Sequence, residues 1–275
     1  MWLQTSWDAR SYAEANGSGT KPRTRKADHV LAYVRKAFNW QATRDDDFKS
    51  PIVKGMARTK PKERARTRVL DDDEIRTLWR ALDQWPADHG YPQLMRTMLL
   101  TGLRIDAASR GHAKEIRGDT WILPKDRTKQ LGSDFLLPLS APLKAMIAGK
   151  SSYLFSTDGG KTSISGFSKF KRQLDAKIKG LRRGHPMKHW TNHDLRRTAR
   201  TLLSSLSTPD IAERCLAHVI PGVRGVYDLH DYECEKRDAF AALANRVLGI
   251  VDPQANVVAL KLRKSSAASM SRKTI

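Results

Sequence analysis

Apolar residues recur at helical spacing between residues 71 and 102. The first set follows the i, i+3, i+4, i+7 pattern of one helix face and comprises Ile75, Leu78, Trp79 and Leu82. Asp71 precedes this face and Glu74 follows three residues later, a spacing typical of a capping box. A second helix is predicted through Leu94, Met95, Met98 and Leu99. Gly102 is expected to end that helix, because glycine adopts the left-handed conformation of a helix terminus easily.

Two short apolar stretches predict strands instead. Residues 120–123 and 135–137 flank a basic loop, residues 125–133. Helical patterns resume after Ser165, and Thr208-Pro209 is typical of a cap followed by a first-turn proline. The last long helix is predicted from Phe240, Leu243, Val247 and Leu248. These elements predict an α+β domain over residues 68–251, mostly helical with a small antiparallel sheet.

The flanking segments are too small to form another core. Residues 1–27 mix Gly, Ser, Lys and Arg and are expected to be a flexible leader. Within residues 28–67, one amphipathic helix is predicted over 29–39 from Leu31, Val34 and Phe38. A connector, residues 54–68, carries seven basic residues against one glutamate and is expected to be extended. Residues 252–275 contain one strand-like piece, 257–260, before a basic tail expected to be disordered.

Charge narrows the class of partner. Lys and Arg number 50 against 29 Asp and Glu, a net charge of +21 on 275 residues. That excess predicts a polyanionic partner, most commonly nucleic acid, although a generally basic solubilising surface is the alternative. The sequence contains no run of about 18 apolar residues, so no membrane span is predicted. The chain start lacks the pattern of a signal peptide, and two cysteines cannot form a disulfide framework, so a cytoplasmic location is expected.

One predicted helix face concentrates positive charge. Its members lie at i, i+3, i+4 and i+7 and are His193, Arg196, Arg197 and Arg200. A solvated basic face usually alternates with acids, yet no acid lies between Leu195 and Ser207, and Asp194 is the only one nearby. This pattern favours an anion, and phosphate in particular, as the ligand of the face.

The complete candidate set, in chain order, is Arg104, Lys129, His193, Arg196, His218 and Tyr227. Arginine forks grip the oxygens of a phosphodiester, and lysine and histidine transfer protons. Tyrosine can hold a phosphate covalently. The set therefore indicates DNA strand cleavage through a phosphotyrosine.

Each candidate has a structural alternative. Arg104 follows a predicted helix end, where an arginine often contacts free carbonyls. Spacing alone does not select Lys129 over Lys125 or Arg127 in the same loop. His218 closes a helical stretch, where an imidazolium suits the helix dipole. A loop tyrosine such as Tyr227 is more often a packing residue, and Tyr232 is its rival as nucleophile.

Other motifs predict no metal or cofactor. The C-x2-H and H-x3-C spacings of Cys215, His218, His230 and Cys234 resemble zinc ligands. A buried free thiol is the favoured interpretation of Cys215, because it falls in an apolar helical stretch. Gly159-Gly160-Lys161-Thr162 lacks the earlier glycine of a phosphate loop, where Phe155 stands. The sequence has neither an H-E-x-x-H motif nor an acidic cluster, which argues against a two-metal nuclease.

In order and spacing these motifs resemble the tyrosine recombinase family, most closely the integrases of phages and genomic islands. The resemblance covers residues 68–251 and rests on T-G-L-R at Arg104, the lysine hairpin ending in L-P-L-S, H-D-L-R-R-T at His193, L-A-H at His218 and V-Y-D-L-H-D-Y at Tyr227. It implies that Arg104 and Arg196 clamp the scissile phosphate and that His193 acts as acid or base. Lys129 would protonate the leaving 5′ oxygen, His218 would hydrogen-bond the phosphate, and Tyr227 would form a 3′-phosphotyrosyl link without metal or ATP.

The sequence departs from the family in two places. Where members commonly carry glutamate, three residues after the first arginine, this chain has Ala107. Members also carry a helical core-binding domain of which residues 28–67 resemble a truncated remnant. The hypothesis is a site-specific recombinase acting on double-stranded DNA, in integration or excision of a mobile element, as a tetramer on paired sites. A degenerate DNA-binding remnant and a type IB topoisomerase are the alternatives.

Further basic residues are expected to contact the DNA backbone. They belong to the connector and to the cationic helix face: Lys54, Arg58, Lys60, Lys62, Arg64, Arg66, Arg197 and Arg200. Such contacts position a protein on DNA without reading its bases.

Overall fold

The computed structural model describes residues 24–57, 66–128, 131–220, 222, 228 and 230–253. The chain divides into two compact units, Met1–Thr67 and Arg68–Ile275. The leader before residue 24 and the strand-like piece at 257–260 lie outside the described residues. Among the helices that are described, none is both long enough and apolar enough to cross a bilayer.

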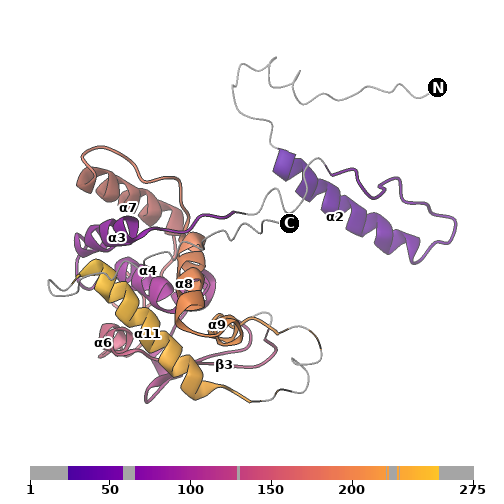
Figure 1. Ribbon diagram of the computed structural model, residues 1–275. Coiled ribbons are helices and arrows are strands. Elements are labelled where there is room, and N and C mark those ends of the chain that lie inside the picture. The colour runs from indigo at the N-terminus through magenta and orange to yellow at the C-terminus, as the bar shows by residue number, and fades with distance from the viewer. Residues whose placement is uncertain are drawn as a thin grey trace, which may run out of the picture. The chain divides into compact units, whose positions relative to one another are not determined.

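The described part of the first unit is built around helix α2, Thr24–Ala42 (Figure 1). The predicted helix is confirmed and extends beyond residues 29–39 at both ends. The chain after α2 folds back on it: the Phe38 and Phe48 ring centroids are 5.7 Å apart, and Arg35 Nη2 donates to Val53 O at 3.0 Å. Tyr33 and Trp40 remain exposed, so a single helix buries few of its apolar side chains.

The second unit is mostly helical with one small sheet, as the sequence predicts. Its elements, in chain order, are α3 (Asp72–Asp83), α4 (Gly90–Thr101), α5 (Ile105–Ser109), η1 (Ala113–Glu115), β1 (Ile116–Arg117), β2 (Thr120–Leu123), β3 (Phe135–Pro138), α6 (Ala141–Ile147), α7 (Phe167–Leu181), α8 (Asn192–Leu206), α9 (Pro209–Cys215) and α11 (Glu233–Val251). Figure 1 shows α8 and α11 beside α4, which both helices contact.

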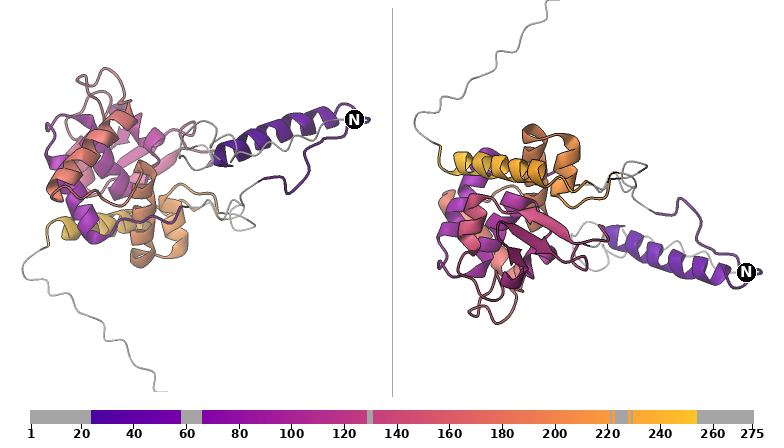
Figure 2. Two further views of the ribbon diagram at one scale, coloured as in Figure 1. Left: turned by 90° about the horizontal axis from the view of Figure 1, so that it is seen from above. Right: turned by 90° about the horizontal axis from the view of Figure 1, so that it is seen from below.

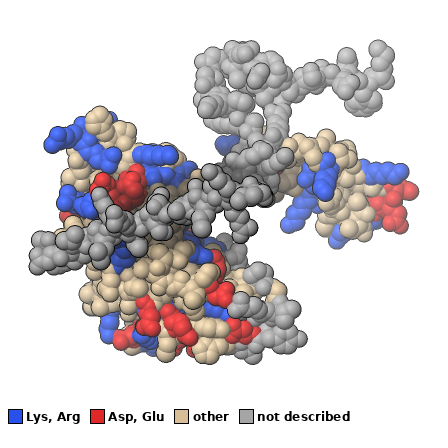
Figure 3. All heavy atoms as spheres, viewed as in Figure 1, with Lys and Arg blue, Asp and Glu red and all other residues tan. Residues whose placement is uncertain are grey.

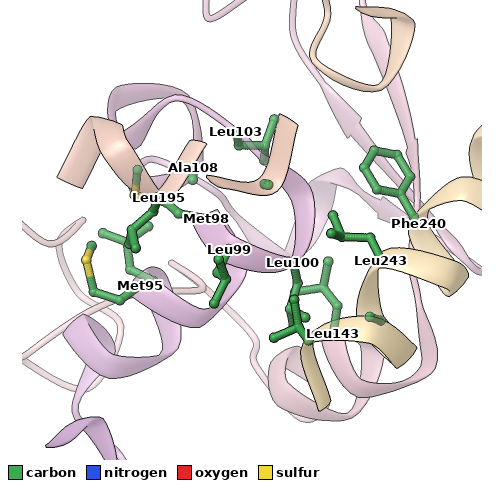
Figure 4. Close-up of a cluster of buried hydrophobic side chains, with 14 of the residues drawn as sticks. Met95, Met98, Leu99, Leu100, Leu103, Ala108, Leu143, Leu195, Phe240 and Leu243 are labelled. Carbon is green, nitrogen blue, oxygen red and sulfur yellow. The ribbon is translucent and has the colours of Figure 1, made fainter. Parts of the chain in front are cut away.

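Helix α4 forms the centre of the core. Met95, Met98, Leu99 and Leu100 are all buried, and Figure 4 shows them between side chains of α8 and α11, among them Leu195. A helix that is apolar on nearly all sides must be surrounded by other elements. Burying each such side chain stabilises the fold by about 1.5–3 kcal/mol. Because α8 packs its apolar face on these side chains, α4 determines where α8 lies.

The sheet is antiparallel in the order β1-β2-β3. In its register, Trp121 of β2 pairs with Leu137 of β3, and both side chains are buried. Helix α11 lies against β3 (Figure 2), where Lys236 Nζ donates to Leu136 O at 3.0 Å. The two predicted strands are confirmed, whereas β1 was not predicted, because two residues are too short to show a periodic pattern.

Local capping explains where the first helices begin and end. Asp71 and Glu74 form the predicted capping box at the start of α3. Gly102 ends α4 in the left-handed conformation, with φ 68°, and its N–H bonds Met98 O at 2.8 Å. A Cβ added at Gly102 would overlap Leu216 Cδ2, so this turn depends on glycine for both its backbone angle and its packing.

Gly102→Ala should therefore destabilise the fold more than the same change at Gly149. Gly149 also has a left-handed φ, 72°, but nothing lies within 4 Å of an added Cβ there. We expect a loss of about 1 kcal/mol in unfolding free energy for Gly149→Ala, from the backbone angle alone. For Gly102→Ala we expect about 2–4 kcal/mol, because overpacking is added. Urea unfolding measures both; equal losses would contradict the packing argument.

Candidate active site

Arg196 is buried on α8 and joins three segments of the chain. Its Nη1 donates to Gly102 O at 2.6 Å, and its Nη2 donates to Leu216 O at 2.9 Å. Nη2 also lies 2.7 Å from His218 Nε2. Gly102 follows α4 and Leu216 follows α9, so the carbonyls are those that a helix end leaves without an intrahelical partner. The guanidinium is thus fixed where two helix ends meet.

The electrostatic environment of Arg196 is unfavourable to its charge. Burial, together with the nearby Arg104 cation, lowers the pKa of Arg196 to about 9, and Glu213 only partly opposes this shift. Desolvation disfavours a charged group, and a second cation adds repulsion. A bound anion would relieve both effects, so the site is suited to an anionic ligand.

His193 and Arg104 lie in the same electrostatic environment. Burial lowers the pKa of His193, and Arg196, Arg197 and Arg104 lower it further, while Asp194 opposes them. His193 stands in the first turn of α8, and Arg104 is the residue at the start of α5. A lowered pKa keeps the imidazole neutral at pH 7, when it can accept a proton. The structure therefore brings Arg104, His193, Arg196 and His218 together.

The charges that the sequence predicts to be unpaired on α8 are partly neutralised. Arg197 forms an ion pair with the buried Asp194, and Arg200 pairs with Glu213 on α9 at 2.7 Å. The sequence of α8 did not reveal the second partner, because Glu213 lies 13 positions away from Arg200. Figure 3 likewise shows acidic side chains among the basic ones on the drawn face of the second unit. Of the three arginines, only Arg196 makes no direct contact with a carboxylate of the described chain.

The basic hairpin holds one arginine in a structural role. Arg127 is buried, forms an ion pair with Glu115 and donates from Nη1 to Ala107 O at 3.2 Å. Ala107 is the position where the family that the motifs resemble commonly carries glutamate. Arg127 therefore ties α5 to the loop that follows β2. Lys125 is exposed at the start of this loop, and Lys129 lies outside the described residues.

Tyr232 is anchored by its neighbours. Its Oη donates to Asp228 Oδ2 at 2.7 Å, and the Arg214 guanidinium lies 4.1 Å from its ring centroid. Arg214 also pairs with Asp228 at 2.6 Å. Tyr227 lies outside the described residues. A phenol already bonded to a carboxylate and covered by a cation is poorly placed to attack a phosphate.

The remaining candidates divide by exposure and position. Cys215 is buried and Cys234 exposed, and burial raises the pKa of the Cys215 thiol to about 12, as expected for an inert structural cysteine. Lys54 and Arg66 of the connector are exposed. Arg58, Lys60, Lys62 and Arg64 lie outside the described residues.

Sequence reasoning missed the groups that hold the candidate residues in place. These are the Gly102 and Leu216 carbonyls, Glu213, and the pair of Glu115 with Arg127. None of these groups belongs to an apolar pattern or a local motif. The only short-range signal among them is the spacing of five residues between Glu213 and His218, at a helix end. Long-range side-chain contacts of this kind leave no periodic signal in the sequence.

Comparison with known proteins gives matches in structure but not in sequence. No protein-family model and no curated protein matches the chain. The structure of a lambda integrase(75–356) dimer bound to a COC′ core site matches with a TM-score of 0.55 and 15% identity, over 76% of this chain and 75% of that one. A longer lambda integrase dimer on a COC′ core site matches equally well, but this chain spans only 63% of it.

A second recombinase shares the same architecture. XerH site-specific recombinase, bound to a palindromic difH substrate in a post-cleavage complex, matches with a TM-score of 0.51 and 13% identity, over 83% of this chain and 68% of that one. The class is therefore an α+β, mostly helical domain with a small antiparallel sheet. More particularly, the chain has the fold of the tyrosine recombinases lambda integrase and XerH, as its motifs predict. At these identities the likeness establishes the fold, and function must be argued from the site.

Proposed function

We propose that the chain is a site-specific tyrosine recombinase, which cleaves and rejoins DNA strands through a 3′-phosphotyrosyl intermediate. The observation that carries this proposal is the buried Arg196 guanidinium beside Arg104 and His218. A phosphodiester carries negative charge that would offset the repulsion between these two cations. Its two non-bridging oxygens also match the planar fork of a guanidinium. The net charge of +21 supports duplex DNA as the source of that phosphate.

In the proposed mechanism, Tyr227 Oη attacks the phosphorus and the bond from phosphorus to the 5′ oxygen breaks. The neutral His193 accepts the tyrosine proton, for which its lowered pKa suits it. Lys129 donates a proton to the leaving 5′ oxygen. Arg104 and Arg196 stabilise the extra charge of the pentavalent transition state, and the Gly102 and Leu216 carbonyls hold Arg196 in place before the reaction begins. Rejoining reverses these steps, and the phosphotyrosyl bond keeps the energy needed for it.

Recombination also requires two DNA sites to be held together. We propose that the chain assembles as a tetramer on paired sites, in integration or excision of a mobile element. Support comes from the related structures: lambda integrase has been solved as a dimer on a core site and as a tetramer bound to a Holliday junction. Strand cleavage without assembly on paired sites would instead indicate a type IB topoisomerase.

Tyr227→Phe should abolish covalent attachment to DNA and leave duplex binding nearly unchanged. Tyr232→Phe should retain attachment, because the Tyr232 hydroxyl is bonded to Asp228. The assay is incubation with nicked suicide substrates carrying attachment-site DNA from the native locus, followed by denaturing gel electrophoresis. DNA mapped to Tyr232 in a trapped adduct would disprove the assignment. Duplex binding by the natural protein without any adduct would identify a degenerate DNA-binding remnant.

Arg196→Lys should reduce single-turnover cleavage by about 10²-fold or more, the scale of losing one preorganised donor. An ammonium group cannot reach the Gly102 and Leu216 carbonyls and grip a phosphate with a planar fork. Arg197→Lys is the matched control on the same helix, because a lysine can still pair with Asp194. Its cleavage rate should fall far less. Equal losses for two variants with wild-type circular dichroism would contradict the roles given to the two arginines.

A further inference from the structure

Glu213 connects two basic residues beside the candidate site. Its Oε1 accepts hydrogen bonds from Arg200 Nε at 3.0 Å and Arg200 Nη2 at 2.7 Å. Its Oε2 contacts His218 Nδ1. Partial burial opposes ionisation of Glu213, but the hydrogen bonds from His218 and Arg200 outweigh it and lower the pKa of this carboxyl. Glu213 is therefore ionised at neutral pH, with both oxygens engaged.

The backbone at the end of α9 sets this pairing. Ala217 adopts the left-handed conformation, with φ 52°, and its N–H bonds Arg214 O at 3.0 Å. His218 N bonds Glu213 O at 3.1 Å. This pair of hydrogen bonds is a Schellman motif, which brings the third-last helical residue close to the second residue beyond the cap. Those two residues are Glu213 and His218, so the helix end itself places the carboxylate against the ring.

The contacts around His218 determine which ring nitrogen carries the proton. Arginine only donates, so Arg196 Nη2 makes Nε2 of His218 the acceptor. The single proton of the neutral ring then lies on Nδ1 and is donated to Glu213. A phosphate oxygen cannot donate in this way. For a hydrogen bond from His218 to phosphate, Nε2 must gain a proton from solvent, and the ring becomes an imidazolium facing Glu213 through Nδ1–H.

We propose that Glu213, held by Arg200, is a positioning residue that fixes His218 through Nδ1–H and allows it to bind the scissile phosphate as an imidazolium. This inference rests on the proposed function, because it assigns how His218 meets the phosphate. A hydrogen bond from the imidazolium to phosphate is roughly twice as strong as one from a neutral ring. Glu213 makes this stronger bond possible by stabilising the imidazolium. In this account Arg200 acts on Glu213 rather than on the DNA backbone.

Glu213→Gln tests the proposal with a side chain of the same shape. The two Arg200 donors favour the amide oxygen, so the amide NH₂ should face Nδ1, which must then accept. In the DNA complex, where Nε2 faces the phosphate instead of Arg196, the single ring proton then lies on Nε2 and the ring stays neutral. Cleavage in a single turnover should fall about 10- to 10²-fold, less than for a lost donor. Duplex affinity should be unchanged, and the ¹⁵N spectrum of His218 should show one unprotonated ring nitrogen in the DNA complex, against none in the natural protein.

Glu233→Gln is the matched control. Glu233 pairs with Arg237 on α11, and its side chain is 36% exposed, the same as that of Glu213. This variant should leave both cleavage and the His218 spectrum unchanged. Arg200→Met should cause a smaller loss than Glu213→Gln, because the carboxylate that accepts from His218 Nδ1–H remains and only its anchor is removed. It should not change the salt dependence of DNA affinity. A fall of about 0.9 in that slope would instead assign Arg200 to a DNA phosphate.

Two results would overturn the inference: an Nε2–H tautomer of His218 in the free natural protein, or wild-type cleavage by Glu213→Gln. The spectrum of the free protein is independent of catalysis. If the natural protein formed no DNA adduct while its His218 spectrum changed as expected in Glu213→Gln, the recombinase proposal would fail and the coupling of Glu213 to His218 would stand.

Discussion

The buried guanidinium of Arg196, bonded to the Gly102 and Leu216 carbonyls, is the interaction on which the candidate site depends. Removing a charged group from water costs several kcal/mol unless polar partners replace the water. Here the partners are carbonyls at the ends of α4 and α9, and these helices are held by the apolar core around α4. Within the described residues, the same burial that fixes the guanidinium leaves its charge without a directly contacting carboxylate. The core therefore produces a rigid cationic site.

The sequence predicted those parts of the fold that local interactions decide. The capping box at Asp71, the glycine end of α4 and the proline start at Thr208 were all correct, because each depends on residues within one turn. Strand β1 was missed because two residues carry no periodicity. The left-handed conformation of Ala217 was missed for another reason. That conformation is usually predicted from a glycine after the helix, and here the residue is alanine.

Four of the six predicted members of the candidate site are brought together by the fold, whereas the groups that hold them in place were not predicted. Residue type and order alone identified Arg104, His193, Arg196 and His218, which the fold brings together. The sequence did not reveal that Asp194 and Glu213 neutralise the other two arginines of α8, since one of these pairs spans two helices. The pairing has a physical consequence. Of the three arginines on α8, it leaves only Arg196 without a carboxylate in direct contact, within the part of the chain that the structure describes.

The most direct test of this account is a crystal structure of the Tyr227→Phe variant bound to duplex attachment-site DNA. In that complex, one phosphate should have non-bridging oxygens within about 3 Å of Arg104, Arg196 and His218 nitrogens. Arg197 and Arg200 should keep their carboxylate partners in that complex. A phosphate bound by Arg197 and Arg200, with none in hydrogen-bond reach of Arg196, would contradict the central claim.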